Sequence, residues 1–170
     1  GLRHDPEHLP SLDALEAIHA EAGDHERVAA ILGRKIRATG KHPERQKALL
    51  ARLAELQQGV LGRVDVAREA YKRSLEIDPD FRPALRFLAP DARRRGDRAA
   101  AEAYYQRLAG EPSSPGSVDD DADVPGDRAR ALAALAAMAW DDGRPGEAER
   151  HLLSALELDP GQEVLMALLE

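Results

Sequence analysis

Arginine is the residue type with the most evident chemistry in this sequence of 170 residues. Arginines outnumber lysines 20 to 4, and one stretch of 17 residues contains six of them: Arg82, Arg86, Arg93, Arg94, Arg95 and Arg98. A guanidinium group binds carboxylates and phosphates through paired hydrogen bonds. The stretch predicts either a basic surface for an acidic or phosphorylated segment, or cations that complement the carboxyl end of a helix by about 0.3–1 kcal/mol each.

Other residue types form no catalytic or metal-binding pattern. The six histidines, for which solvated or capping roles are expected, show no metal-ligand spacing: His4, His8, His19, His25, His42 and His151. Asp119, Asp121 and Asp123 alternate as calcium ligands do, but Val124 and Arg130 stand where a calcium loop needs Gly and Glu. No nucleophile elbow, phosphate loop or dinucleotide fingerprint is present. We therefore expect no metal, no cofactor and no enzyme activity.

Composition narrows the class of partner. The net charge of −7 disfavours nucleic-acid binding, and no apolar run is long enough to cross a membrane. Hydrophobic residues make up 43% of the chain but aromatic residues only 4%, so Ala and Leu must fill the space between closely set helices. The absence of cysteine leaves the compartment undetermined, and a cytoplasmic location is favoured. We read the arginine excess as genome composition and favour a bacterial source.

A repeat organises the elements that must position the arginines. The segment 62–79, GRVDVAREAYKRSLEIDP, returns 81 residues later at 143–160 as GRPGEAERHLLSALELDP. Both copies begin with Gly, place small and bulky residues on one helical face, and end in Asp-Pro. Gly23, Gly62, Gly96 and Gly143 lie 39, 34 and 47 residues apart, and the last interval is a 34-residue period with a 13-residue insertion.

Apolar periodicity predicts a pair of helices in each of four units, at about 9–42, 43–80, 81–112 and 127–160. The clearest stripe follows Gly62 and consists of Ala67, Ala70, Tyr71, Ser74 and Leu75. In the first helix we expect Ser11 to be the N-cap and the inner face to hold Leu12, Leu15 and Ile18 or His19. Lys35 is irregular, because the other units have a small residue at that position.

Three segments depart from the repeat. Pro90 lies in the middle of a helical pattern, where it predicts a kink or an early stop. Residues 111–126 are rich in Ser, Pro, Gly and Asp, and predict an exposed, partly disordered acidic insertion. Residues 161–170 predict a trailing helix that caps the stack or begins a further repeat. The first residue is Gly rather than Met, so the chain could be a segment of a longer protein, and this point stays open.

A helix-turn-helix period of 34 residues with these residues resembles the tetratricopeptide repeat (TPR) family. The resemblance is carried by segment 62–79, by Leu88-Ala89, Gly96, Ala101 and Tyr105, and by Leu135-Ala136, Gly143, Ala148, Leu152, Ala155 and Pro160. It covers nearly the whole chain outside 111–126, although the first unit matches by its turn and spacing alone. It implies an all-α fold: one domain over 1–170, built as a right-handed superhelical stack of antiparallel helix-turn-helix repeats, a TPR-like α-solenoid.

The resemblance also implies a function. It implies a non-enzymatic scaffold that binds a protein or peptide segment in a concave groove lined by the first helix of each unit. The arginines make an acidic segment a candidate partner. The groove candidates are Arg52, Arg86, Arg93 and Arg130. We expect Trp140 to seal the core at the end of its helix, with a role as groove anchor as the alternative. The Asn-containing clamp by which some members hold a C-terminal carboxylate is not carried over, because this chain has no Asn.

Three alternatives stay open at this point. One is self-assembly into a homo-oligomer through the ends of the stack, using Leu165, Leu168 and Leu169. Another is a regulatory segment of a larger enzyme. The third concerns the groove itself, which the aspartates of 119–123 could occupy by folding onto the arginines.

Overall fold

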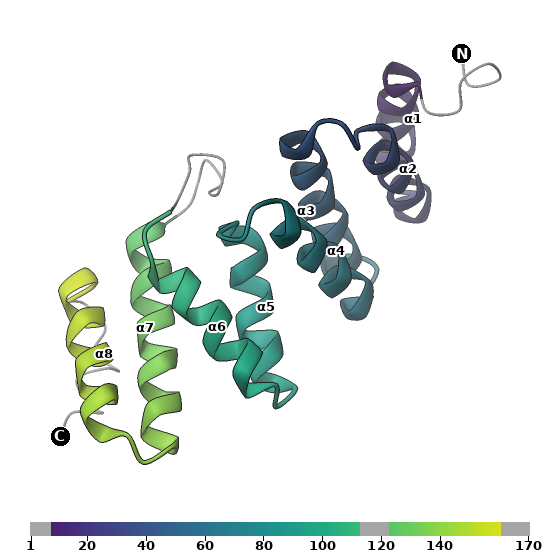
Figure 1. Ribbon diagram of the computed structural model, residues 1–170. Helices are drawn as coiled ribbons and strands as arrows, with labels where there is room; N and C mark the ends of the chain where they lie inside the picture. The colour runs from purple at the N-terminus through teal and green to yellow at the C-terminus, as the bar shows by residue number, and fades with distance from the viewer. Residues whose placement is uncertain (1–7, 113–122, 161–170) are drawn as a thin grey trace. The chain divides into compact units, whose positions relative to one another are not determined.

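The computed structural model describes residues 8–112 and 123–160, which belong to two compact units, Gly1–Pro79 and Asp80–Glu170. All regular secondary structure in these described residues is α-helical. The first unit holds α1 (Leu9–Glu21), α2 (His25–Ala38), α3 (Pro43–Gly59) and α4 (Val64–Ile77). The second holds α5 (Arg82–Arg94), α6 (Arg98–Ala109), α7 (Val124–Asp141) and α8 (Pro145–Leu158) (Figure 1). The predicted all-α fold is confirmed.

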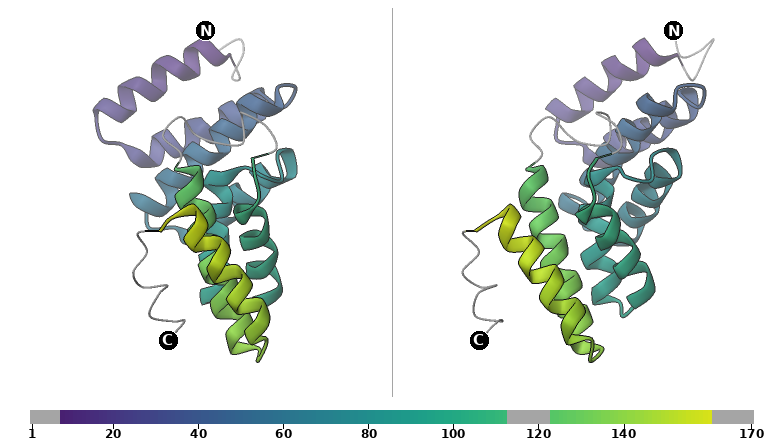
Figure 2. Two further views of the ribbon diagram at one scale, coloured as in Figure 1. Left: turned by 90° about the vertical axis from the view of Figure 1, so that its left-hand side faces the viewer. Right: turned by 60° about the vertical axis from the view of Figure 1, so that its left-hand side comes forward.

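Within each unit, every helix packs against its neighbour in the chain. Figures 1 and 2 both show α7 and α8 side by side and antiparallel, joined by a short turn. The pairs α1–α2, α3–α4, α5–α6 and α7–α8 are the helix-turn-helix repeats that the spacing predicts. The right-handed superhelix and the single domain over 1–170 stay predictions.

Four glycines form the turns inside the pairs. Gly23, Gly62, Gly96 and Gly143 have φ values of 68°, 66°, 76° and 70°, a left-handed conformation in which a β-carbon is strained. They are the same four glycines whose spacing revealed the repeat. The turn residue therefore explains why glycine recurs with this period.

Small residues let the helices approach closely. The buried residues of α4 are Ala67, Ala70, Tyr71, Ser74 and Leu75, which is the predicted stripe. The equivalent alanines of the second unit, Ala101 and Ala148, are also buried, with exposed fractions of 0% and 1%. The small side chain of an alanine at these positions lets the paired helices approach closely, and the larger side chains fill the space between them.

The first helix differs from its prediction at two places. Its N-cap is His8 and it begins at Leu9, so the assignment of Ser11 as N-cap is wrong; the Ser11 hydroxyl instead lies 2.9 Å from Nδ1 of His8. Ile18 is 59% exposed, whereas Glu16 is buried. Glu16 can be buried because Nζ of Lys35 donates a hydrogen bond to its carboxylate over 2.7 Å. The irregular lysine of the second helix is therefore the partner of a buried glutamate.

Of the two outcomes predicted at Pro90, a kink or an early stop, the early stop is wrong, because α5 continues to Arg94. The kink stays a prediction. Proline has no backbone N–H, so the helix loses one hydrogen bond there. Ala89 and Ala92, on either side of Pro90, are both buried. Burial of this face stabilises the turn enough to keep it helical.

The start of α7 also differs from the prediction, because this helix begins at Val124, inside the predicted insertion 111–126. The side chain of Asp123 caps the helix by accepting a hydrogen bond from the backbone N–H of Gly126 over 3.0 Å. Residues 113–122 and the predicted trailing helix 161–170, with Leu165, Leu168 and Leu169, lie outside the described residues. Among the helices that are described, none is both long and apolar enough to cross a membrane.

Candidate functional site

The candidate site residues are divided between the two units. Arg52 belongs to α3 of the first unit, and the other four belong to α5 and α7 of the second: Arg86, Arg93, Arg130 and Trp140. Nη1 of Arg52 lies 2.6 Å from Oε1 of Glu16, the buried carboxylate that Lys35 also contacts. Arg52 is thus engaged with an acidic group of its own unit.

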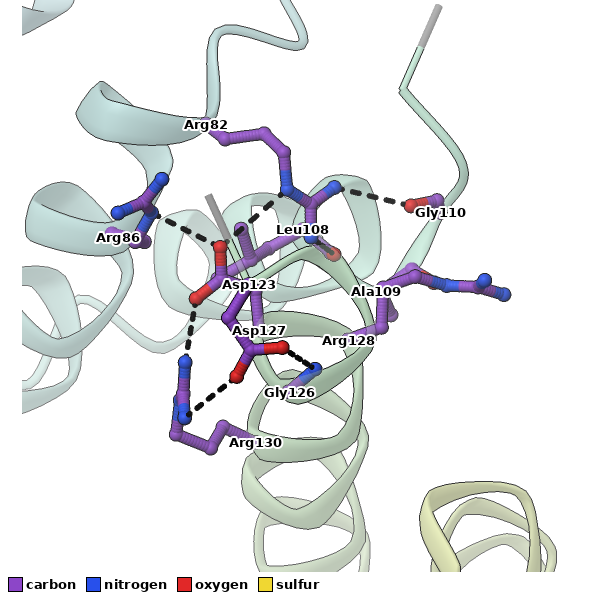
Figure 3. A network of polar contacts seen from close by, with 10 residues as sticks. All are labelled: Arg82, Arg86, Leu108, Ala109, Gly110, Asp123, Gly126, Asp127, Arg128 and Arg130. Carbon is purple, nitrogen blue, oxygen red and sulfur yellow. Dashed lines mark hydrogen bonds and ion pairs between the residues drawn. The ribbon is translucent and has the colours of Figure 1, made fainter. Parts of the chain in front are cut away.

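In the second unit, Asp127 in the first turn of α7 brings arginines from two helices together (Figure 3). Its carboxylate is 3% exposed, and Oδ1 accepts a hydrogen bond from Nη2 of Arg130 over 2.8 Å. Oδ2 lies 3.0 Å from Nε of Arg86 and 3.6 Å from Nε of Arg82. We call the following residues the Asp127 cluster: Arg82, Arg86, Asp123, Asp127 and Arg130. The prediction singled out Arg86 and Arg130 but missed the carboxylate between them; the only signal for it was the helical i, i+3 spacing of Asp127 and Arg130.

Arg82 has a structural role in the cluster. Its side chain is 1% exposed and donates hydrogen bonds to the carbonyl oxygens of Leu108 and Gly110 over 2.8 and 3.2 Å. These carbonyls lie at the carboxyl end of α6, where the helix dipole favours a cation. Burial lowers the pKa of Arg82, and the charge of Asp127 opposes this shift. Arg82 therefore ties α5 to the end of α6 and the start of α7.

Asp123 is the second carboxylate of the cluster among the described residues. Its Oδ2 lies 3.9 Å from Nη1 of Arg130. The side chains of Arg86 and Arg130 are 34% and 61% exposed. An anion from solvent can therefore reach two guanidinium groups whose positions are fixed by a buried carboxylate.

A cavity of about 320 Å³, here called the arginine cavity, opens beside these two guanidinium groups. Its lining residues are Arg86, Pro90, Tyr105, Leu108, Asp127, Arg130, Ala131 and Ala134. The cavity combines charged groups with apolar walls. Apolar surroundings strengthen an ion pair by lowering the local dielectric constant.

A second cavity of about 320 Å³, here called the tryptophan cavity, is bordered by Trp140 and Arg93. Trp140 is 66% exposed, so the expectation that it seals the core is wrong. The inner face at this end of α7 is occupied by Ala136 and Ala139, which pack against α8 and leave no room there for an indole ring. Ala137, one turn before Trp140, also lines the cavity.

Tyr105 of α6 borders the arginine cavity, and the charge of Arg93, which lines the tryptophan cavity, acts on its hydroxyl. Burial raises the pKa of the Tyr105 hydroxyl, and the neighbouring Arg93 charge opposes the shift. Arg86 and Arg93 are about two helical turns apart on α5, so the cavities follow one another along the helix.

No metal centre accompanies these groups in the part of the chain that the structure describes, where no three His, Cys, Asp or Glu side chains are placed to hold an ion.

Comparison with known proteins bears on the repeat itself. The sequence model of a family described as Tetratricopeptide repeat matches residues 60–81, which contain the turn at Gly62 and all of α4. No curated protein matches the chain. The matched segment contains the first copy of the internal repeat, and the packing of successive helix pairs agrees with a helical repeat of this kind.

Proposed function

We propose that this tetratricopeptide repeat protein is a non-enzymatic scaffold that binds a segment of another protein on the α5–α7 surface of its second unit. Repeats of this family are generally protein–protein interaction modules. The observation that carries the proposal is the succession of the arginine and tryptophan cavities along α5 and α7. Partly exposed arginine and tryptophan side chains beside cavities are the groups that contribute most binding energy at protein interfaces.

The chemistry of this surface favours binding over catalysis. A guanidinium group stays protonated at neutral pH and so does not act as a base. The carboxylate of Asp127 is already engaged by Arg82, Arg86 and Arg130. Such a cluster can orient and hold an anion, but it offers no positioned proton acceptor for a nucleophile.

The first unit is less suited to an acidic partner. Arg52 borders a cavity of about 270 Å³ whose walls also include Asp13, Glu16 and Lys35. The two cations and two carboxylates cancel there, so an incoming carboxylate meets no excess positive charge. The second unit is the better candidate, because four of the five candidate residues lie there beside the arginine and tryptophan cavities.

The experiment is a selection of random short peptides on the immobilised full chain, followed by NMR of the isotope-labelled chain with the selected peptides. We expect perturbed amide resonances around Arg86, Arg93, Arg130 and Trp140. The Arg86→Gln/Arg130→Gln variant is expected to bind these peptides at least about tenfold more weakly, the loss of one charge-assisted hydrogen bond. Arg107→Gln, a matched change at an exposed residue of α6, is expected to bind normally. Absence of binders, or perturbations confined to α1–α4, would contradict the proposal.

Self-assembly and a regulatory role within a larger enzyme stay alternatives to this function. Light scattering over a range of protein concentrations tests the first of them. A mass that stays at the 18.5 kDa of one chain would exclude a homo-oligomer.

A further inference from the structure

We propose that the tryptophan cavity binds a large apolar side chain of the partner segment, with an anionic residue on one side of it that pairs with Arg93 and a basic residue on the other that pairs with Asp141. This inference rests on the proposed function and adds the chemistry of the partner at this cavity. Three observations support it: the walls of the cavity, the charges that border it, and the composition of the rest of the second unit.

The walls of the tryptophan cavity suit an apolar side chain. Its uncharged lining residues are Ala136, Ala137, Trp140, Ala148 and Leu152. Three of them are at most 6% exposed and belong to the hydrophobic core between α7 and α8, namely Ala136, Ala148 and Leu152. Trp140 is 66% exposed and offers a flat face for packing. A side chain that enters the cavity therefore removes its own apolar surface and that of the indole from water.

Arg93 differs from the arginines that follow it in the chain. Arg94 and Arg95 lie 3.7 and 3.6 Å from carboxylate oxygens of Asp91. Among the described residues, no carboxylate forms an ion pair with Arg93. The charge of Arg93 acts on the hydroxyl of Tyr105, which is itself uncharged at neutral pH. This exposed guanidinium group beside an apolar cavity can therefore pair with an anionic residue of a partner.

Asp141 differs from its neighbour in the same way. The carboxylate of Asp142 lies 2.6 Å from Arg98 and 2.6 Å from Arg144. In the described part of the chain, no basic side chain forms an ion pair with Asp141, although it is exposed. Arg93 lies on α5 and Asp141 lies at the end of α7, and the two do not pair with each other. The cavity is thus bordered by one charge of each sign that a partner can neutralise.

Composition favours a partner over a segment of the chain itself. The two segments of the second unit outside the described residues, 113–122 and 161–170, contain no Lys, Arg or His, so neither offers a cation to Asp141. Alternate residues of an extended segment point to the same side. An anionic, a large apolar and a basic residue at i−2, i and i+2 of a partner, in either direction, can therefore reach Arg93, the cavity and Asp141 together.

The peptide selection described above tests this motif when the selected sequences are read. We expect Trp, Phe, Tyr or Leu, with Asp or Glu two residues away on one side and Lys or Arg two residues away on the other. Selection on Arg93→Glu is expected to replace the acidic preference by a basic one, and selection on Asp141→Lys to replace the basic preference by an acidic one. Ala137→Leu, which places a larger side chain at the cavity, should lose the apolar preference. Circular dichroism of each variant shows whether the helices are intact.

Charge reversal in the best selected peptide gives the quantitative test. By fluorescence anisotropy we expect Arg93→Glu to bind this peptide at least about tenfold more weakly, because like charges then meet. Changing the acidic residue of the peptide to Lys should restore most of the affinity for this variant. Arg107→Glu and Glu149→Lys, matched charge changes at exposed residues of α6 and α8, should bind the original peptide normally. Phosphoserine in place of the acidic residue shows whether a carboxylate or a phosphate binds more tightly, and loss of either on Arg93→Glu supports the pairing.

Equal affinities of the original and the charge-reversed peptide for Arg93→Glu would overturn this inference, whereas the proposed function would stand if the peptides still bind α5 and α7. A selection without binders overturns the proposed function as well. The emission of Trp140 without peptide tests the other occupants. A shift of this emission with protein concentration, or on removal of residues 161–170, would assign the cavity to a second copy or to the chain's own segment and overturn the inference.

Discussion

Nε of Arg86 on α5 lies 3.0 Å from Oδ2 of Asp127 on α7, where the carboxylate is 3% exposed. The pair joins the first helices of two consecutive repeats, while the arginine side chain is still 34% exposed. This contact between α5 and α7 therefore also presents a guanidinium group to solvent. Substitution of Asp127 should consequently affect mainly stability, whereas substitution of Arg86 should affect mainly ligand binding.

Removal of the shared carboxylate should destabilise the second unit strongly. We expect Asp127→Ala to lower the free energy of unfolding by about 3–5 kcal/mol, because Arg82 would stay buried without its counter-charge. Arg130→Ala removes a 61% exposed partner of the same carboxylate and should cost only about 0–1 kcal/mol. Urea unfolding followed by circular dichroism measures both, and equal losses would contradict the structural role of Asp127.

Two buried lysines should make stability depend on alkaline pH. Burial lowers the pKa of Lys35 and of Lys47, but hydrogen bonds and the charges of neighbouring carboxylates outweigh it, so both pKa values are raised. A raised pKa contributes stability that is fully present below the unfolded value of about 10.4 and is lost as the pH rises through the folded value. We expect urea midpoints to fall above about pH 10 for this reason. In the Lys35→Met/Lys47→Met variant, the urea midpoint should fall less above this pH. A pH profile of the variant parallel to that of the wild type would contradict a contribution of the two lysines.

Tyr71 should be a major packing residue of the first unit. It is 3% exposed on α4, so we expect Tyr71→Ala to cost about 3–5 kcal/mol of unfolding free energy. Tyr104→Ala, at a half-buried position of α6, should cost clearly less. Thermal and urea unfolding of the two variants test this, and near-neutral stability of Tyr71→Ala would be incompatible with the packing described.

Two glycines should respond to the same substitution with opposite signs. Gly62 has a φ of 66° and nothing within 4 Å of an added β-carbon, so Gly62→Ala should cost about 1–2 kcal/mol through backbone strain alone. Gly146 lies inside α8 and also has free space, so Gly146→Ala should stabilise by about 0.4–1 kcal/mol. Destabilisation by both changes, measured by urea unfolding, would argue against the left-handed turn as the cause.

Trp140 should report directly on ligand binding. It is the chain's single tryptophan and is 66% exposed, so its emission should be that of a solvated indole and should be quenched readily by iodide. A selected peptide bound in the tryptophan cavity should shift this emission to shorter wavelength and protect it from the quencher. Trp140→Ala should leave stability within about 1 kcal/mol of the wild type. Unchanged emission at saturating peptide would place the ligand elsewhere.

Local patterns predicted much of the fold because they depend on residues within one helix or turn. The stripe of α4 and the turn at Gly62 follow from side-chain periodicity and from the recurrence of glycine, and both agree with the structure. Predictions failed where a distant partner decides the outcome. The inner position was assigned to Ile18 or His19. Ile18 is exposed, and Glu16 is buried because Lys35 of the next helix neutralises it.

Only part of the candidate surface was predicted, because its contacts also join residues of different helices. Arg86 and Arg130 were identified as single residues, but their meeting at Asp127 was not. Trp140 was placed in the core because a large aromatic residue is usually buried. Its exposure depends on how closely α8 packs against α7, and the sequence of α7 alone does not reveal this packing.

The repeat, its helix pairs and its turn residues can be inferred from the sequence, since each depends on interactions within a few residues along the chain. Which charged groups are buried, and which side chains border a cavity, depends on the packing of different helices. Buried charges need partners, and the partners come from other helices: Glu16 and Lys35 are 19 residues apart, and Lys47 and Asp78 are 31 residues apart.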